Sequence, residues 1–568
     1  MRRSTAWILS IILVAVFAAT FLWPLVRIIQ RGFLDEDGSP TIKYIAEVFR
    51  NPIYLEGLLN SLKIAIGTTT LVTLIAVPLA WLANRYNFLG KGAFQGLLLV
   101  PMILPPFVGA IGFQQIFGTY GAFNSLLHIN VDWVGQARYW GVILLQALGL
   151  YPILYLNVAA SLANIDPAME QAAQNLGCGP WTRFWRITLP LIMPGFFAGG
   201  TIVFIWSFTE LGTPLIMQYT RCTPVQVFDA LKDIGTSPFP YALVFVMLAS
   251  SVLLYVLGKF VFGRNSYAMQ SKAATTSGTT TAVGWRAIAI PLLFLAVVAI
   301  ALLPHVGVVL TAFSPPGGWY QTILPEQFTV GNFKEALGHS MTVSSIGNSL
   351  LFSSFAVGVN IVVGVMVAFI VVRSTLPFRG VIDALAMLPL AVPGIVMAFG
   401  YLAISSFFTT QDFVKNRPLL MWLLDVRQNP TIFLVIAYAV RRLPYMVRSA
   451  VAGLQQTSAT LEEASANLGA SGLRTLLKIT GPLIVANLVA GAMLAFAFSM
   501  LEVSDSLMLA QQQQYFPITK TIYELFQLIG TGKYLASALG VWAMVFLATT
   551  ILGASVILGR KMGAVFRV

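Results

Sequence analysis

Apolar runs of about 20 residues recur along the whole chain, and this feature most limits how it can fold. A helix of about 20 residues crosses about 30 Å of hydrocarbon, and lipid offers the backbone no hydrogen-bond partners, so such runs must fold as helices. The chain is 57% hydrophobic and only 10% charged, a balance far from that of soluble globular proteins. We therefore predict an all-α polytopic membrane protein in contact with lipid.

Hydropathy over windows of about 19 residues predicts twelve spans. The basic N-terminal segment begins like a signal peptide, but its apolar run is about twice the usual length, so we predict a retained first span. The predicted spans lie at residues 7–29, 58–84, 95–118, 139–162, 190–212, 240–262, 285–312, 345–372, 380–406, 431–453, 482–505 and 534–558.

The distribution of basic residues orients these spans. With the N-terminus in the cytoplasm, the short inside segments hold more Lys and Arg than the longer outside segments, so the positive-inside rule predicts cytoplasmic N- and C-termini. This topology and attraction to anionic lipid explain the net charge of +13, and no nucleic-acid partner is expected. Cys178 and Cys222 then lie on opposite sides of the membrane, and two cysteines are too few for a disulfide framework.

The two halves of the chain repeat one another. Each half has six predicted spans, so both enter the membrane in the same direction and are related by an axis normal to the bilayer. We predict a first half at 1–262, a flexible cytoplasmic linker at 263–284, and a second half at 285–568. Prolines paired in the third and ninth spans predict kinks there. At an offset of 288 residues, and of 292 further along, the matched pairs include Asn60 and Asn348, Arg85 and Arg373, Pro105 and Pro393, Gly177 and Gly469, and Glu210 and Glu502.

A polar, basic segment interrupts the apolar pattern once in each half, at 166–190 and at 458–482. Asp166 followed by Pro167, or Ser458, is typical of a helix start, and Gly177 or Gly469 ends the helix after about ten residues. A second short basic helical stretch then leads back into the membrane. Because so short a helix is marginal in water, its presence twice on one face predicts docking against a partner; an ordinary amphipathic interfacial loop is the alternative.

The spacing within these segments is similar to that of the EAA loop of binding-protein-dependent ABC importer permeases. It is carried by Gln171-Ala172-Ala173, Gly177, Ile187, Leu189 and Pro190, and again by Glu463-Ala464-Ser465, Gly469, Ile479 and Pro482, with departures at Gln171, Ser465 and Gly481. The resemblance implies a type I importer fold of two homologous six-helix halves, in which each loop forms a coupling helix seated on a cytoplasmic ATPase. The coupling residues that it implies are Glu170, Gln171, Ala172, Gly177, Glu462, Glu463, Ala464 and Gly469.

The same resemblance defines the expected partners. The sequence has no G-x-x-x-x-G-K-[ST] segment to bind nucleotide phosphates, so the chain is expected to be a transport subunit and not an enzyme. The implied partners are two copies of a cytoplasmic ABC ATPase and an external solute-binding protein, with no cofactor in this chain, at the bacterial inner membrane. Fusion of both halves looks most like the ferric-iron and thiamine permeases, so ferric iron is the expected cargo.

Several other cargoes and one other mechanism stay open. Thiamine, phosphonate, polyamine or another small solute would fit the same architecture. An ion-gradient-driven secondary transporter would predict unwound helices and ionisable residues at the midplane of both halves, and it would leave the twin cytoplasmic loops unexplained.

Five charged residues are candidates for the translocation path. Glu210 and Glu502 are equivalent positions near the outer ends of the fifth and eleventh spans, and Asp505 lies one turn further on. Such carboxylates can receive a hard cation, or they can serve as interfacial or gate-forming hydrogen-bond acceptors. Arg441 and Arg442 lie about ten residues into the tenth span, where an arginine faces either a cavity or a structural partner.

The three histidines carry no metal prediction. His128, His305 and His339 are expected in outward-facing loops. Their positions lack the spacing of metal ligands, so no metal site is predicted.

Overall fold

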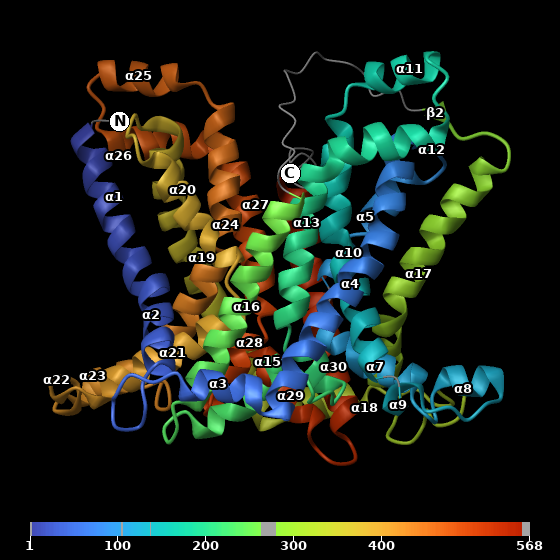
Figure 1. Cartoon of the computed structure of the whole chain (residues 1–568), viewed down its shortest axis with the longest axis horizontal. Helices are drawn as coiled ribbons and strands as arrows, with labels where there is room; N and C mark the ends of the chain where they lie inside the picture. The colour runs from blue at the N-terminus through green and yellow to red at the C-terminus, as the bar shows by residue number, and fades with distance from the viewer. Residues whose placement is uncertain (1–2, 104–105, 137, 263–279, 559–568) are drawn as a thin grey trace. The chain divides into compact units, whose positions relative to one another are not determined.

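The computed structural model describes residues 3–103, 106–136, 138–262 and 280–558, and these are almost entirely helical (Figure 1). The one sheet among them is a parallel pair of two-residue strands, β1 (Tyr86–Asn87) and β2 (Thr280–Thr281). The predicted all-α fold is therefore confirmed. Of the predicted linker at 263–284, residues 263–279 lie outside the described residues, while β2 forms part of its end.

The helices of the first half begin with one long apolar segment that contains a π-helical turn just before Pro24. Because proline cannot donate to the helical ladder, a local widening before it is the expected response. In chain order the α-helices are α1 (Arg3–Phe17), α2 (Trp23–Gly32), α3 (Lys43–Arg50), α4 (Pro52–Arg85), α5 (Lys91–Leu97), α6 (Val100–Ile103), α7 (Pro106–Phe117), α8 (Ala122–Leu127), α9 (Trp133–Gln136), α10 (Arg138–Ala163), α11 (Pro167–Asn175), α12 (Pro180–Arg183), α13 (Leu189–Thr209), α14 (Gly212–Ile216), α15 (Thr223–Asp229) and α16 (Phe239–Phe262).

The second half follows the same order of long and short helices. Its α-helices are α17 (Arg286–Phe313), α18 (Gly331–Gly338), α19 (Ser340–Arg373), α20 (Arg379–Met387), α21 (Gly394–Thr410), α22 (Asp412–Lys415), α23 (Pro418–Leu424), α24 (Thr431–Gln456), α25 (Ala459–Asn467), α26 (Gly472–Thr475), α27 (Gly481–Met500), α28 (Ser504–Leu509), α29 (Ile518–Phe526) and α30 (Gly532–Leu558).

Most of the predicted spans correspond to helices that can cross a membrane. Within the described residues nine helical segments are long and apolar enough, and two bent helix pairs bring the number to 11 if each pair is one span. The nine segments are Ser4–Gly32, Pro52–Arg85, Arg138–Ala163, Pro180–Ile216, Phe239–Phe260, Arg286–Phe313, Ser340–Arg373, Gly472–Met500 and Gly532–Gly553.

The tenth predicted span, 431–453, differs from the others. It forms the continuous helix α24, but every 18-residue window of this helix contains Arg441, Arg442 and Arg448, so α24 is not among the apolar segments. Two apolar helices, α19 and α27, provide its main packing partners. α24 is nevertheless one continuous helix over the predicted span, and its neighbours largely bury the two arginines at its middle, Arg441 and Arg442.

The third and ninth predicted spans are broken helices. Arg379–Leu390 and Gly394–Thr410 meet at an angle of 98°, with Pro389 and Pro393 at the break, so the predicted kink in the ninth span is confirmed. The third span breaks between Met102 and Pro106, where Leu104 and Pro105 lie outside the described residues. Proline removes a backbone donor and clashes with the preceding turn, which explains why both breaks carry it.

The polar segments are continuous with the spans that follow them. The predicted basic helical stretch after Gly177 is α12, and it continues without interruption through the π-helical segment Phe184–Thr188 into α13. The same holds for α26, the π-helical segment Leu476–Thr480 and α27. α12 and α26 therefore form the polar ends of helical segments that are long and apolar enough to cross a membrane.

The chain divides into two compact units that exchange segments. Among the described residues, unit 1 comprises those within 3–55, 226–248 and 333–558, and unit 2 comprises those within 56–225 and 249–332. The first helices of the chain, α1 and α2, thus pack with helices of the second half, and α17 packs with helices of the first half. The predicted boundary at the linker follows the sequence repeat, and it stays a prediction.

Each unit places its polar hairpin at one end. In unit 1, α25 and α26 lie at the end where α1 begins, opposite α22 and α23 (Figure 1). In unit 2, α11 and α12 lie at the end opposite α8 and α9 (Figure 1). Within each unit this arrangement agrees with the alternation of inside and outside segments that hydropathy predicted.

Glycines allow α2 to approach α21 and α17 to approach α7 closely. A Cβ atom on Gly400 of α21 would lie 2.7 Å from the Cβ of Pro24 on α2. A Cβ on Gly112 of α7, the equivalent position, would collide with the backbone of α17 at Pro304 and Val308. Close contact between small residues is a principal source of helix association in membranes, where no hydrophobic effect separates protein from lipid.

These contacts predict a specific loss of stability. Gly112→Ala and Gly400→Ala should each lower stability by about 1–3 kcal/mol, because the added methyl group meets backbone or proline atoms that cannot move aside. The matched control is Gly358→Ala on α19, where a Cβ meets nothing within 4 Å. Thermal unfolding midpoints of the detergent-purified protein measure the effect, and equal midpoints for all three variants would contradict it.

Candidate functional site

The two polar hairpins contain the helices that the sequence predicted. The Asp166 side chain accepts a hydrogen bond from the Ala168 N–H at 2.9 Å at the start of α11, and the Ser458 side chain accepts one from the Thr460 N–H at 3.3 Å at the start of α25. Gly177 and Gly469 follow these helices with φ of 80° and 83°, the left-handed conformation that glycine adopts without steric cost. Both predicted helix starts and both predicted helix ends are confirmed.

The residues predicted to couple to an ATPase divide into exposed and inward-facing positions. Gln171, Ala172, Glu463 and Ala464 are exposed, as are both glycines, whereas Ala173 and Ser465 are buried against the hairpin. The side chain of Glu170 lies outside the described residues. The most exposed apolar side chains of the hairpins are Leu176 and Leu468, at 85% and 89%.

Sequence reasoning missed these two leucines. They are equivalent positions of the repeat, each directly before a left-handed glycine. Other apolar residues of the chain are as exposed, so it is the repetition at one structural position in both hairpins that makes these two leucines candidates for contact with a partner. The signal in the sequence was their shared position in the repeat, not their hydrophobicity alone.

A side-chain contact closes each hairpin. In unit 2 the Arg183 Nη1 donates to the Gln174 Oε1 at 2.8 Å, and Arg183 is only 7% exposed. In unit 1 the hydroxyls of Ser465 and Thr475 are 2.9 Å apart and buried. Arg183 and Thr475 are equivalent in the repeat, so the same position holds both hairpins together by different chemistry.

Glu462 connects the hairpin of unit 1 to a span. Its Oε1 lies 3.1 Å from the Arg373 Nε at the last residue of α19, and the two side chains are 20% and 12% exposed. Arg373 also donates to the Thr457 carbonyl at 2.9 Å, and Thr480 donates to the same Glu462 oxygen at 3.4 Å. Any part that Glu462 plays in coupling therefore runs through α19, because its carboxylate lies against Arg373.

Four of the five predicted pathway residues form one ion-pair cluster in unit 1. Glu502 accepts from both Arg441 and Arg442, and the Arg441 Nη1 lies 3.4 Å from the Asp505 Oδ2. Glu502 is 4% exposed and Asp505 is fully buried. The arginines belong to α24, Glu502 lies in the break between α27 and α28, and Asp505 lies in α28. Two positive and two negative charges thus meet in a buried place, where unpaired charges would be very costly.

Glu210 has a different environment in unit 2. It lies at the break between α13 and α14, and its Oε1 and Oε2 accept the Thr213 N–H at 3.1 and 2.9 Å. Gln146 donates to its Oε2 at 3.4 Å, and the Oε1 of Gln146 accepts hydrogen bonds from Ser207 and Thr68. Within the described ranges Glu210 forms no ion pair, and its side chain is partly exposed.

The histidines are not all loop residues. His305 lies inside α17 and is 8% exposed, with its Nε2 facing Gly109, so the prediction of a loop position was wrong for this residue. His128 follows α8, and His339 precedes α19. No group of three or more His, Cys, Asp or Glu side chains lies together to hold a metal ion in the part of the chain that is described.

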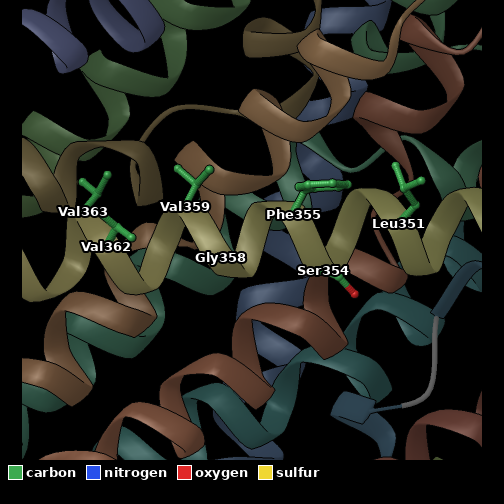
Figure 2. Close-up of a pocket in the computed structure, with 7 residues that line it drawn as sticks. All are labelled: Leu351, Ser354, Phe355, Gly358, Val359, Val362 and Val363. Atoms are coloured by element: carbon green, nitrogen blue, oxygen red, sulfur yellow. The ribbon is translucent and has the colours of Figure 1, made fainter. Parts of the chain in front are cut away.

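An open groove of about 590 Å³ lies along the exposed face of α19 (Figure 2). Its lining is a single stripe of one helix face, and Ser354 is the one polar side chain in it. Such a surface suits acyl chains or another apolar surface and offers no set of groups for chemistry. The lining residues are Leu351, Ser354, Phe355, Gly358, Val359, Val362 and Val363.

Comparison with known proteins finds related chains over both halves. The family described as "Binding-protein-dependent transport system inner membrane component" matches residues 74–265 and 360–562. A Haemophilus influenzae protein named as a ferric transport system permease, FbpB 1, is 26% identical over 88% of this chain and 77% of its own length. The ferric transport system permease protein FbpB of Actinobacillus pleuropneumoniae is 26% identical over 81% of this chain and 64% of its own length. The ABC transporter permease protein y4fN of Sinorhizobium fredii is 24% identical over 85% of this chain and 84% of its own.

The ion pair at the base of the unit 1 hairpin gives a testable prediction. Arg373→Glu should reduce transport by about tenfold without removing the protein from the membrane, because the hairpin loses its tie to α19. The double reversal Arg373→Glu/Glu462→Arg should recover a large part of that loss. Arg448→Glu is the control, since Arg448 pairs with Asp383 at 3.4 Å in a more exposed place and surface pairs contribute little. Equal defects in the single and double reversals would contradict the prediction.

Proposed function

The chain belongs to the family of binding-protein-dependent transport system inner membrane components, and from this premise we propose that it imports ferric iron with the help of two cytoplasmic ATPase subunits. It is the permease subunit of a binding-protein-dependent ABC importer, a multi-pass protein of the inner membrane. The names of two relatives that align with most of the chain support ferric iron as the cargo. The relatives differ enough in sequence that thiamine, phosphonate, polyamine or another small solute is the alternative.

The duplicated hairpin is the observation that carries the proposed assembly. Each hairpin presents one short helix followed by a left-handed glycine, with its most exposed leucine directly before that glycine. Two equivalent surfaces call for two equivalent partners, so we propose two copies of an ABC ATPase, each receiving one hairpin on the cytoplasmic side. The N- and C-termini would lie on that side, an external binding protein would deliver the solute, and the chain itself would hold no cofactor.

The continuous rods give these hairpins a mechanical role. ATP binding would draw the two ATPases together and move α11 and α25 with them. Since α12 continues into α13 and α26 into α27, a rigid displacement of a hairpin would pass directly into a span. The spans end at the breaks that carry Glu210 and Glu502, so such a movement would reach those positions.

A gradient-driven secondary transporter is the competing function. It also accommodates two related halves, but it assigns no role to Leu176 and Leu468 or to the hairpins that present them. The docking surface is the feature that separates the two functions.

Reconstituted uptake tests the proposed function. Vesicles containing this chain, its ATPase and its binding protein loaded with ferric iron should accumulate iron when ATP is supplied on the ATPase side. Vesicles without the ATPase should accumulate none. Uptake driven by a proton or sodium gradient in the absence of the ATPase would contradict the proposal, and import of thiamine but not iron would replace the cargo.

The exposed leucines predict the strength of ATPase docking. Leu176→Asp and Leu468→Asp should each lower the fraction of ATPase that copurifies with the permease, and together they should lower it by at least about tenfold, because burying a carboxylate in an apolar contact is costly. Leu89→Asp is the matched control, since Leu89 is 90% exposed and lies outside both hairpins. Normal copurification of the double variant would remove the docking role.

A further inference from the structure

Glu210 and Glu502 occupy equivalent positions of the repeat, but their electrostatic surroundings are opposite. Glu502 is held by Arg441 and Arg442 in the buried cluster, and Asp505 joins it through Arg441. The charges of this cluster cancel. A cationic solute would gain little from these acids, because it would have to displace arginines that already neutralise them.

The Glu210 carboxylate is compensated only by neutral donors among the described residues. These donors include the Thr213 N–H, at 2.9 Å from Oε2, and the side-chain amide of Gln146. The amide is itself oriented, because its oxygen accepts from Ser207 and Thr68. A partly exposed carboxylate with this support keeps a fixed position and has no cationic partner among the described residues. It lies in an apolar segment long enough to cross a membrane, where ionisable groups are rarely kept without a functional reason.

The difference between the two halves has a steric cause at the broken spans. In unit 1 the Arg441 guanidinium lies directly against Gly394, the first residue of α21, where a Cβ would collide with it. In unit 2 the equivalent of Arg441 is Gly149, and a Cβ there would lie 2.9 Å from Pro106, the equivalent of Gly394. In both units a large residue packs against a glycine. The large residue is on α24 in unit 1, whereas in unit 2 it is at the start of the broken helix α7.

This exchange identifies what the arginines do in unit 1. At the break of the ninth predicted span, the side chain of Arg441 fills the space beside Gly394. At the break of the third, the ring of Pro106 fills the equivalent space beside Gly149. Glu502 and Asp505 balance the charges of Arg441 and Arg442. The equivalent of Arg442 in unit 2 is the uncharged Leu150. The cluster therefore ties α24 and α28 to the start of α21, and its acids serve that contact.

We propose that Glu210, held by Gln146, is the pathway carboxylate that meets the cationic solute, whereas Glu502 and Asp505 form an ion-pair lock on the broken span of unit 1. The inference rests on the proposed function, because it assumes a hard cation as cargo. It assigns the two equivalent acids of the repeat different roles. Carboxylate oxygens are suitable ligands for such a cation.

Uptake of radiolabelled ferric iron by cells that contain the complete importer and lack their other iron uptake systems tests this assignment. Glu210→Gln should lower the uptake rate by at least about tenfold, and Glu210→Asp, which keeps a carboxylate, should retain an intermediate rate. The matched variant in unit 1 is Arg442→Met/Glu502→Gln, which removes one charge of each sign and leaves the Arg441 and Asp505 pair. Copurified ATPase measures how much assembled importer each variant contains.

The outcomes separate the two roles. Two results together support the proposal. Glu210→Gln assembles but loses uptake, and the double variant keeps an uptake rate per assembled complex within about threefold of that of the unmodified importer. Loss of assembly in the double variant also supports the lock. Wild-type uptake by Glu210→Gln, failure of that variant to assemble, or an equal loss of uptake in an assembled double variant would overturn it. If the unmodified importer takes up no iron, the proposed cargo fails first, and this inference fails with it.

Discussion

Lipid satisfies no backbone hydrogen bonds, and the rest of this structure depends on that constraint. The chain responds with long continuous helices, and it interrupts them only where other groups supply the missing partners. At the break after α27, the Glu502 carbonyl accepts from the hydroxyls of Thr519 and Ser506. At the break after α13, the Glu210 carboxylate accepts the Thr213 N–H. The breaks therefore carry polar residues, which supply hydrogen-bond partners that lipid does not.

The same constraint explains how the hairpins are joined to the spans. A helix end that leaves the apolar layer is free to carry polar residues, and in both units the chain uses that freedom to present a short helix and a left-handed glycine. The return into the membrane is uninterrupted, because α12 leads into α13 and α26 into α27. In unit 1 a second connection exists through Glu462 and Arg373. Under the proposed function, a hairpin fixed in this way would move together with the span that follows it.

Much of this organisation could be predicted from the sequence, because it depends on local patterns. Apolar length predicted the spans, and cap residues such as Asp166 and Gly177 predicted the ends of the short helices. What failed depends on tertiary contacts. The burial of His305, the tie of Arg373 to Glu462 and the exchange of α2 and α17 between compact units arise from neighbours distant in the sequence. The sequence repeat also suggested equal roles for Glu210 and Glu502, and only the arginines around Glu502 separate them.

The central claim, that both hairpins face the cytoplasm and are covered by an ATPase, can be tested directly with one cysteine in each. Cys178 follows Gly177 and is partly exposed, Ala470 is its equivalent in the other hairpin, and Cys222 is 1% exposed. A membrane-impermeant maleimide is applied to intact cells and to inverted vesicles. One variant carries Cys178, and the other carries Ala470→Cys in a Cys178→Ser background. The account predicts labelling of both positions in inverted vesicles only, with protection when the ATPase is bound. Labelling from the outside of intact cells, or equal labelling with and without the ATPase, would contradict it.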